Sequence, residues 1–189
     1  MGADKNDPRQ RHHDHHHHDH DHAHDHANAH THCAHQAEHA ARAPEALAAA
    51  ALHCSDQGLK LTPIRRAVLE ALYATHRPIS AYDAIDALAA ATGKREAPVT
   101  VYRALDFLRA AGLAHKLESR NAYIACPFHH MSNEPVMFLI CERCGGVDET
   151  TSEPLARALT GLVQAQGFSP RAQVIEIQGL CAHCRTTSE

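Results

Sequence analysis

Two closely spaced cysteine pairs constrain the fold of this 189-residue chain more than any other feature. The pairs are Cys141-x-x-Cys144 and Cys181-x-x-Cys184, and 36 residues lie between them. Two such pairs can present four thiolates tetrahedrally to one ion, a closed arrangement that suits structural Zn²⁺ and leaves no position for a substrate. One ion would then fasten the two ends of a small module together. Thioredoxin-like redox activity is the competing interpretation, but a single pair suffices for that chemistry.

The composition excludes several other classes of protein. The chain is 44% hydrophobic, which is enough for a core. It has no run of about eighteen apolar residues that could cross a membrane, and its start has no hydrophobic signal segment. We therefore expect a cytoplasmic protein without membrane contact, in which paired cysteines are reduced and bind metal. The net charge of −4 hides a basic middle, because residues 60–120 hold ten Lys and Arg against six Asp and Glu. Such a zone is the usual footprint of a phosphate-binding surface.

The basic middle of the chain contains the pattern of a DNA-reading motif. Apolar residues recur near the helical period at Val99, Val101, Leu105, Leu108 and Leu113. The other side of this predicted helix is polar and partly basic, with Thr100, Tyr102, Arg103, Asp106 and Arg109. Two short apolar runs, 113–117 and 122–125, then flank a turn and predict a hairpin. These elements match the recognition helix and wing of a winged helix-turn-helix, with the helix in the major groove and the wing beside the phosphates. An ordinary surface helix and hairpin would give the same pattern.

The remaining segments predict an α+β fold of two small domains. Further helices are expected over 44–54, 63–75, 81–92 and 155–166, and strands over 135–141, 145–151 and 172–181. We interpret His53 and Cys54 as packing residues. The predicted organisation has a disordered His-rich tail, a winged-helix DNA-binding domain, a hinge loop and an α/β dimerisation domain, at residues 1–42, 43–126, 127–135 and 136–189. The last domain leaves a sheet edge uncovered, which a second copy could pair with.

A second set of candidate metal ligands is spread over both domains and the hinge. It consists of His115, Cys126, His129, His130, Glu134 and Glu149. Nitrogen, sulfur and oxygen ligands together suit a four-coordinate metal such as zinc, although each residue alone could be solvated or part of a core. Residues 1–40 hold fourteen of the twenty histidines. This segment is expected to gather exchangeable metal ions, and a purification tag is the alternative.

Several strings resemble the ferric uptake regulator superfamily and, within it, the zinc uptake regulator branch. They are TVYRALDFLRAAGLAHKLES, NAYIAC, FLICERCGGVDE and VIEIQGLCAHC, and the resemblance covers roughly residues 45 to 185. It implies a homodimeric repressor that binds operator DNA in front of zinc-uptake genes when zinc is present. It also implies two zinc ions per chain: a structural ion on Cys141, Cys144, Cys181 and Cys184, and a sensor ion on His115, Cys126 and Glu149.

The resemblance leaves one metal ligand open and assigns DNA contacts. The family's fourth sensor ligand is a loop His shortly before the first cysteine pair, where this chain departs from the pattern. We favour His130, with His129 and Glu134 as alternatives. Tyr82, Tyr102 and Arg103 match DNA-contacting positions of the family, and the polar helix face and the wing add Thr100 and Lys116.

Three other functions would account for parts of the sequence less completely. A regulator of the same family could respond to iron or nickel. A zinc-storage protein or metallochaperone would explain the His-rich segment but not the winged helix. An enzyme is not expected, because the zinc-deaminase arrangement H-x-E with PCxxC is absent and a four-cysteine site is closed to substrate.

Overall fold

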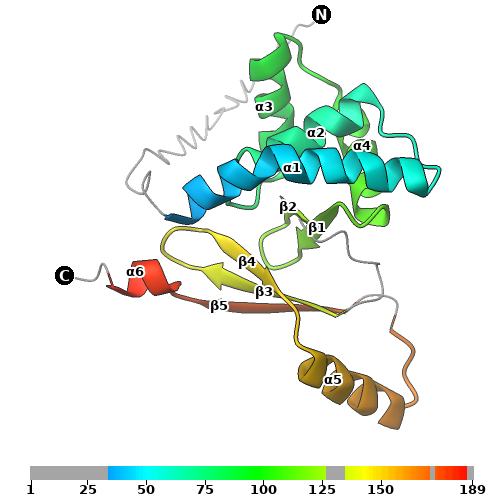
Figure 1. Ribbon diagram of the computed structural model, residues 1–189, viewed down its shortest axis with the longest axis vertical. Coiled ribbons are helices and arrows are strands. Elements are labelled where there is room, and N and C mark those ends of the chain that lie inside the picture. Colours follow the sequence, from blue (N-terminus) through cyan, green and yellow to red (C-terminus); the bar gives the residue numbers. More distant parts are fainter. Residues whose placement is uncertain (1–33, 127–134, 171–172, 187–189) are drawn as a thin grey trace, which may run out of the picture.

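The computed structural model describes residues 34–126, 135–170 and 173–186. Most of the predicted tail and hinge therefore lies outside the described residues. Figure 1 shows helices packed together in the upper part, a small sheet beneath them and one helix at the far end. In these described ranges, no helix combines the length and apolar character needed to span a membrane.

The upper part is the predicted winged helix. It contains α1 (Ala34–Asp56), α2 (Pro63–Tyr73), α3 (Ala81–Thr92) and α4 (Pro98–Ala110), followed by the antiparallel hairpin of β1 (Ala114–Leu117) and β2 (Ala122–Ala125). Its core is aliphatic and is built from buried residues of α2, α3 and α4, among them Val68, Leu69, Leu72, Ile85, Leu105 and Leu108. Full burial of each such side chain stabilises the fold by about 1.5–3 kcal/mol.

Capping residues explain where α3 begins and ends. The Ser80 hydroxyl accepts a hydrogen bond from the Asp83 N–H, and the Asp83 carboxylate accepts one from the Ser80 N–H. This reciprocal capping satisfies backbone donors that the first turn leaves unpaired. Gly93 ends the helix with a φ of 71°, which favours glycine. Thr62 stands at the N-cap of α2, but its side chain makes no capping bond to any described residue.

Two details differ from the sequence-based expectations. Helix α1 begins at Ala34 rather than Pro44, because the preceding AHQAEHAARA is rich in good helix formers and Pro44 is accommodated inside the helix. Val99 was expected on the buried stripe of α4, and this is wrong. Its side chain is 57% exposed, because the first turn of α4 projects beyond the core that Val101 and Leu105 enter.

The hairpin β1–β2 has protein against both faces. On one face, Ala114, Tyr123 and Ala125 pack into the core of the winged helix. On the other face, Leu117 and Ile124 pack against the strand β3 (Val136–Cys141) of the lower part. Alternate residues of a strand point to opposite faces, so four-residue strands can serve both cores. The wing is therefore one of the elements that join the two domains.

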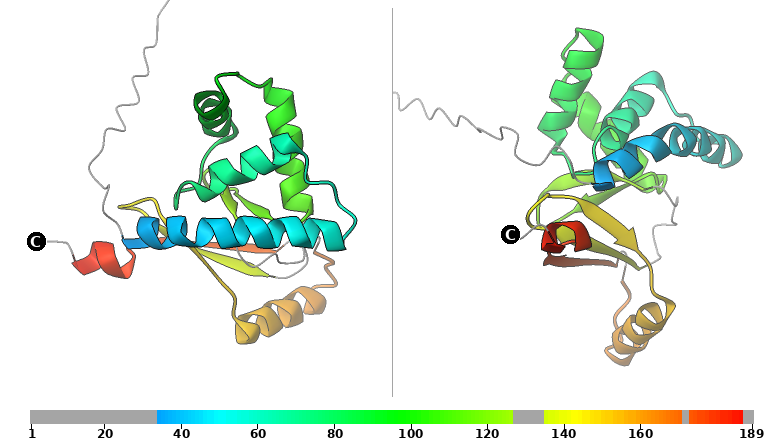
Figure 2. Two further views of the ribbon diagram at one scale, coloured as in Figure 1. Left: turned by 45° about the horizontal axis from the view of Figure 1, so that its top comes forward. Right: turned by 60° about the vertical axis from the view of Figure 1, so that its left-hand side comes forward.

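The lower part is the predicted α/β module. After β3 come β4 (Val147–Thr150), α5 (Glu153–Ala165), β5 (Val174–Gly179) and the short α6 (Ala182–Thr186). The strand order is β4-β3-β5, with β4 antiparallel and β5 parallel to β3. Helix α5 makes the crossover between β4 and β5 but buries no residue in the described chain, and both views of Figure 2 show it standing away from the upper helices.

Candidate metal centres and DNA-binding surface

The four paired cysteines meet at one point at the end of the sheet. Their sulfur atoms all lie within 4.8 Å of one another. Cys141 ends β3 and Cys144 follows in the next turn, while Cys181 and Cys184 flank the start of α6. The cluster closes the module because Cys141 ends β3 and Cys181 follows two residues after the neighbouring parallel strand β5.

Backbone N–H groups point at these sulfur atoms. The Gly146 N–H donates to Cys144 Sγ at 3.4 Å, and the Cys181 N–H donates to Cys141 Sγ at the same distance. Burial raises the pKa of the Cys141 thiol, but backbone N–H donors, first that of Cys181, outweigh burial and lower this pKa to about 6. Burial raises the pKa of Cys144 and Cys184. One thiolate is thus already favoured before any ion is bound.

The donor set fits a structural zinc ion. Four sulfurs at about 2.3 Å from one Zn²⁺ would lie about 3.8 Å apart in a tetrahedron. That spacing falls within the 4.8 Å limit of the cluster, and all four donors are soft thiols. Cys141, Cys144 and Cys184 are buried, so little space is left for a substrate.

A second cluster lies between the two domains. Its members are His115 on β1, Cys126 directly after β2, and Glu149 on β4, with ligand atoms within 4.8 Å of one another. His115 Nε2 lies 3.4 Å from Glu149 Oε1, and Cys126 Sγ lies 3.6 Å from the same oxygen. The side chains of His115 and Glu149 are 16% and 5% exposed, and Cys126 is fully buried. Residues distant in the sequence therefore share one small polar site.

Neighbouring groups hold this second cluster in place. The Tyr73 hydroxyl donates a hydrogen bond of 3.0 Å to the Cys126 carbonyl, and burial raises the pKa of this phenol, so it stays a donor. The His115 ring meets the Phe138 ring edge-on at 5.1 Å. Nitrogen, sulfur and oxygen donors in a nearly dry site suit zinc. The candidate fourth ligands His129, His130 and Glu134 lie outside the described residues.

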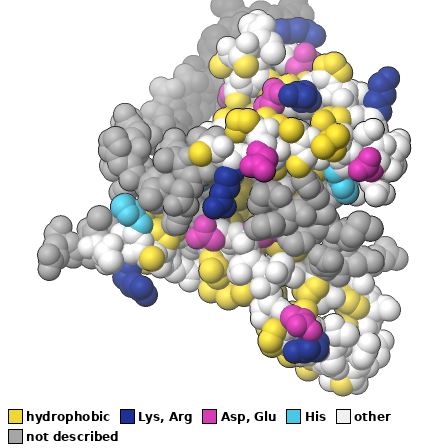
Figure 3. All heavy atoms as spheres, in the orientation of Figure 1, with side chains coloured by type: hydrophobic (Ala, Val, Ile, Leu, Met, Phe, Trp, Pro, Cys, Tyr) yellow, Lys and Arg dark blue, Asp and Glu magenta, His cyan; other side chains and the backbone are white. Residues whose placement is uncertain are grey.

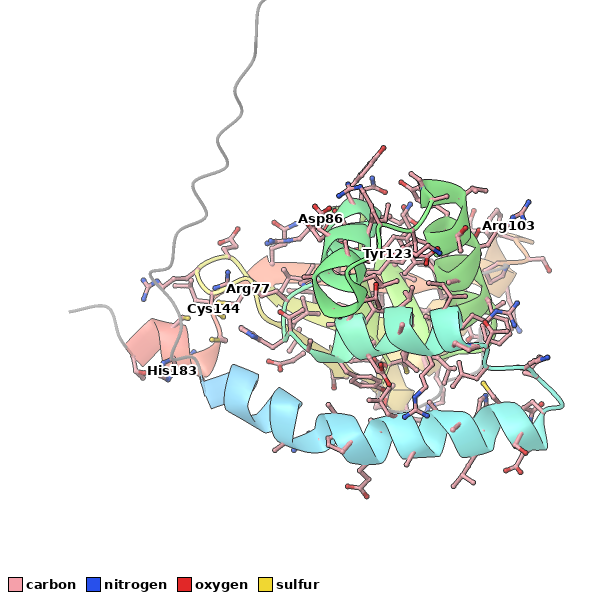
Figure 4. All side chains as sticks on the ribbon, turned by 90° about the horizontal axis from the view of Figure 1, so that it is seen from above. Arg77, Asp86, Arg103, Tyr123, Cys144 and His183 are labelled. Atoms are coloured by element: carbon pink, nitrogen blue, oxygen red, sulfur yellow. The ribbon has the colours of Figure 1, made fainter. Side chains whose placement is uncertain are left out.

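The predicted DNA contacts lie in the first turn of α3, in the first two turns of α4 and on β1 of the wing. Tyr82 is 61% exposed and Tyr102 is 40% exposed, although both are large. Arg103 projects outward from α4 in Figure 4, and Thr100 on the first turn is half-buried. Lys116 differs from the others, because its side chain is 22% exposed and its ammonium lies 2.8 Å from Glu118. A phosphate contact by Lys116 would have to compete with this ion pair.

Some residues at the domain junction were not predicted. His76, in the loop after α2, is 4% exposed and packs against Gly146 in the turn of the four-cysteine site. Arg77 lies against Gly145, and Figure 4 shows Arg77 beside Cys144. Glu176 on β5 binds the tip of the wing. The sequence offered only one weak signal for these residues, the charged Glu176 within the apolar strand VIEIQG. The contacts depend on how the two domains meet, which no local pattern reports.

These features define a class of winged-helix proteins with candidate metal sites in and beside a C-terminal α/β module. The chain belongs to the ferric uptake regulator family, whose model matches residues 56–178. The zinc uptake regulation protein of Escherichia coli (strain K12) is 41% identical over 140 residues, which cover 74% of this chain and 81% of that protein. The ferric uptake regulation protein of Legionella pneumophila is 27% identical over 132 residues, which cover 69% and 94%.

Solved structures show the same relationship. A zinc uptake regulator complexed with zinc and DNA is 40% identical with a TM-score of 0.71, covering 76% of this chain and 95% of that chain. The crystal structure of holo XcZur is 43% identical with a TM-score of 0.65, covering 75% and 97%. The resemblance to this family and to its zinc branch is confirmed, and so is the predicted α+β fold.

Proposed function

We propose that this protein is a zinc-responsive transcriptional repressor that binds operator DNA as a homodimer and controls zinc-uptake genes. The observation that carries the proposal is the cluster of His115, Cys126 and Glu149 between the wing and the C-terminal sheet. The similarity of the chain to a zinc uptake regulation protein and to a zinc uptake regulator complexed with zinc and DNA supports this function.

The mechanism follows from which elements supply the ligands. When bound, zinc supplies a positive charge that three or four donors share. His115 and Glu149 can reach a common ion while the wing lies on the sheet, so metal binding favours the docked arrangement of the winged helix. A ligand shifts such an equilibrium only by its different affinity for the two states. The proposal includes two zinc ions per chain, and the ion on the four cysteines is a permanently bound structural ion.

Dimerisation is supported by apolar surface that this chain leaves uncovered. Large hydrophobic residues are exposed on α5, on β5 and in the segments that flank β5, namely Leu162, Phe168, Val174, Ile177 and Leu180. Figure 3 shows such side chains on the surface of α5. A second copy would bury this surface and set the two α4 helices for half-sites about 34 Å apart, one turn of DNA.

Operator reading is assigned to the exposed face of α4. Arg103 can donate a bidentate pair of hydrogen bonds to guanine O6 and N7. The proposal also gives Tyr82, Thr100 and Tyr102 contacts to bases or phosphates, and gives Lys116 a phosphate contact that competes with its ion pair to Glu118. The proposal includes a cytoplasmic location, where operator DNA and reduced thiols occur together, and no catalytic activity.

The direct test is DNA binding at controlled free zinc. The probe is duplex DNA that the wild-type protein selects from a random pool in the presence of zinc. Wild type should shift this duplex at low protein concentration with zinc, and weakly without it. Cys126→Ser should keep its fold and the four-cysteine zinc but gain little affinity when zinc is added, because its softest ligand is lost.

Matched variants and metals sharpen this test. Cys54→Ala removes another buried thiol that belongs to the core of the winged helix, so it should keep the zinc response. Alanine variants of His129, His130 and Glu134 should identify the fourth ligand by which of them copies Cys126→Ser. Iron or nickel acting at lower free concentration than zinc would assign the protein to another metal. If the curves of DNA binding against free zinc overlap for wild type and Cys126→Ser, the assignment of the sensor site is wrong.

A further inference from the structure

A single carboxylate on β5 holds the tip of the wing. Glu176 Oε1 accepts a hydrogen bond of 2.8 Å from the Glu118 N–H. Glu176 Oε2 accepts one of 3.3 Å from the Ser119 N–H and another from the Ser119 hydroxyl. The donors are consecutive groups of the turn between β1 and β2, so both carboxylate oxygens are engaged by one short segment. Hydrogen bonds to an ionised acceptor are about twice as strong as neutral ones.

Glu176 lies in the same cross-strand row as a residue of the second metal cluster. In the sheet, Phe138 on β3 pairs with Glu149 on β4 and with Glu176 on β5. Directly paired residues point to the same face, so the two carboxylates flank the Phe138 side chain on the face that the wing covers. Glu149 meets His115 near the start of the wing, and Glu176 meets Ser119 at its tip.

The wing is thus attached to the sheet at two separate points. Between them, Leu117 and Ile124 of the wing pack against Phe138 and Ile140, and the His115 ring lies edge-on to Phe138. One attachment consists of candidate metal ligands, and its strength depends on the ion. The attachment through Glu176 uses backbone and hydroxyl donors, which need no metal.

We propose that Glu176 is a positioning residue that holds the wing tip on the sheet and thereby sets the zinc concentration at which the protein binds DNA. This inference rests on the proposed zinc-responsive function. When a ligand binds one of two conformations, its apparent dissociation constant is the intrinsic one divided by the fraction of protein in that conformation. Glu176 raises the fraction of docked wing before zinc arrives, so less free zinc is needed to complete the docking.

The first experiment compares zinc titrations of DNA binding by the full chain. Glu176→Gln keeps the shape of the side chain but turns an amide N–H₂ toward the wing donors. It should raise the free zinc needed for half-maximal binding of the selected duplex by about tenfold, whereas saturating zinc should restore most of the affinity. Ser119→Ala removes one donor and should shift the midpoint in the same direction by less.

The control is Glu153→Gln on α5. It changes the net charge by the same amount in the same domain, and its carboxylate pairs with Arg157 on the helix surface. Its midpoint should equal that of wild type. A midpoint unchanged in both Glu176→Gln and Ser119→Ala would overturn the inference, as would an equal loss of affinity at all zinc concentrations.

The second experiment observes the wing tip without DNA. Hydrogen exchange at the Glu118 and Ser119 amides should be slow in wild type and at least several times faster in Glu176→Gln, with exchange in α2 unchanged. Unaltered exchange at these two amides would also overturn the inference. If wild type shows no zinc-dependent DNA binding, the proposed function fails, yet the exchange data still report whether Glu176 holds the wing tip.

Discussion

At the scale of single residues, exposure separates side chains that build the winged helix from those available to a partner. Along α4, Val101, Leu105 and Leu108 are fully buried, whereas Tyr102 is 40% exposed and Arg103 projects outward. A buried residue contributes to the stability of the domain, and an exposed guanidinium contributes little to it. The effect of changing Arg103 should therefore appear in DNA binding and not in folding.

Arg103→Ala should reduce the affinity for the selected duplex by about 1–3 kcal/mol and relax the preference at one base pair of each half-site. The thermal midpoint should stay close to that of wild type. The control is Arg109→Ala, which removes the same charge from the last turn of the same helix. There, Arg109 Nη1 lies 3.9 Å from Asp106 Oδ1. Equal losses on selected and random duplexes for Arg103→Ala would contradict a base-reading role.

At the scale of elements, the turn between β3 and β4 serves both the metal cluster and the domain junction. Cys141 at the end of β3 and Cys144 in the turn supply two thiols, and the backbone of the turn contacts His76 and Arg77 of the winged helix. The Val147 N–H also donates to the His76 carbonyl at 3.3 Å. A change in this turn should therefore affect metal content, domain docking or both.

Cys144→Ser should release one tightly bound zinc per chain and loosen the C-terminal module, since metal-binding energy at such a site is also folding energy. Zinc content by mass spectrometry under native conditions and circular dichroism report the two effects. His183→Ala, between the cysteines of the second pair, should leave the zinc content unchanged because His183 lies outside the cluster. Unchanged zinc content in Cys144→Ser would remove the four-cysteine assignment.

Gly146→Ala should disturb the junction by a different route. An added Cβ would lie 2.8 Å from His76 Cδ2, so the His76 loop or the turn must move. Overpacking of this kind costs about 1–3 kcal/mol. Gly161→Ala on α5 is the control, because its Cβ would meet no described atom within 4 Å and alanine favours a helix by about 0.5–1 kcal/mol. The measurement is chemical denaturation of both variants. Combining Gly146→Ala with His76→Ala should recover part of the loss.

At the scale of the whole molecule, the face of the C-terminal sheet that meets the wing is well packed, whereas α5 and the β5 edge are poorly covered in the described chain. The wing covers one side of β3, while α5 has no fully buried residue and β5 forms an open edge. An amphipathic helix and a sheet edge left without cover call for a partner, and a second copy supplies both at once.

Ile177→Glu should convert the dimer into a monomer, because it places a charge on the exposed β5 edge. Analytical ultracentrifugation measures the change, and binding to a two-half-site duplex should fall with it while the four-cysteine zinc remains. Leu52→Glu is matched in chemistry and is even more exposed, at 66%, but lies on α1. Its dimer should persist. A fully dimeric Ile177→Glu would place the interface elsewhere.

Periodicity and spacing in the sequence determined the local elements of this protein. The helical stripe that starts at Val99 predicted α4, and the helices expected over 63–75 and 81–92 correspond to α2 and α3, because helical periodicity acts over a few residues. The cysteine spacing predicted one four-sulfur cluster, since a CxxC pair needs no more than a tight turn to converge. His115, Cys126 and Glu149 were among six candidate ligands named from their residue types, and the family resemblance then selected these three.

The arrangement between domains was decided by tertiary structure alone. The helical period places Val99 on the apolar stripe of α4, yet its side chain is exposed. Whether a first-turn residue reaches the core depends on where the helix crosses its neighbours. His76 and Glu176 have no spacing relation to the groups they contact, because their positions follow from wing residues that pack on β3 with one face and on the helices with the other. Local sequence signals determine the helices and strands. Burial of both faces of the wing determines which distant residues come into contact.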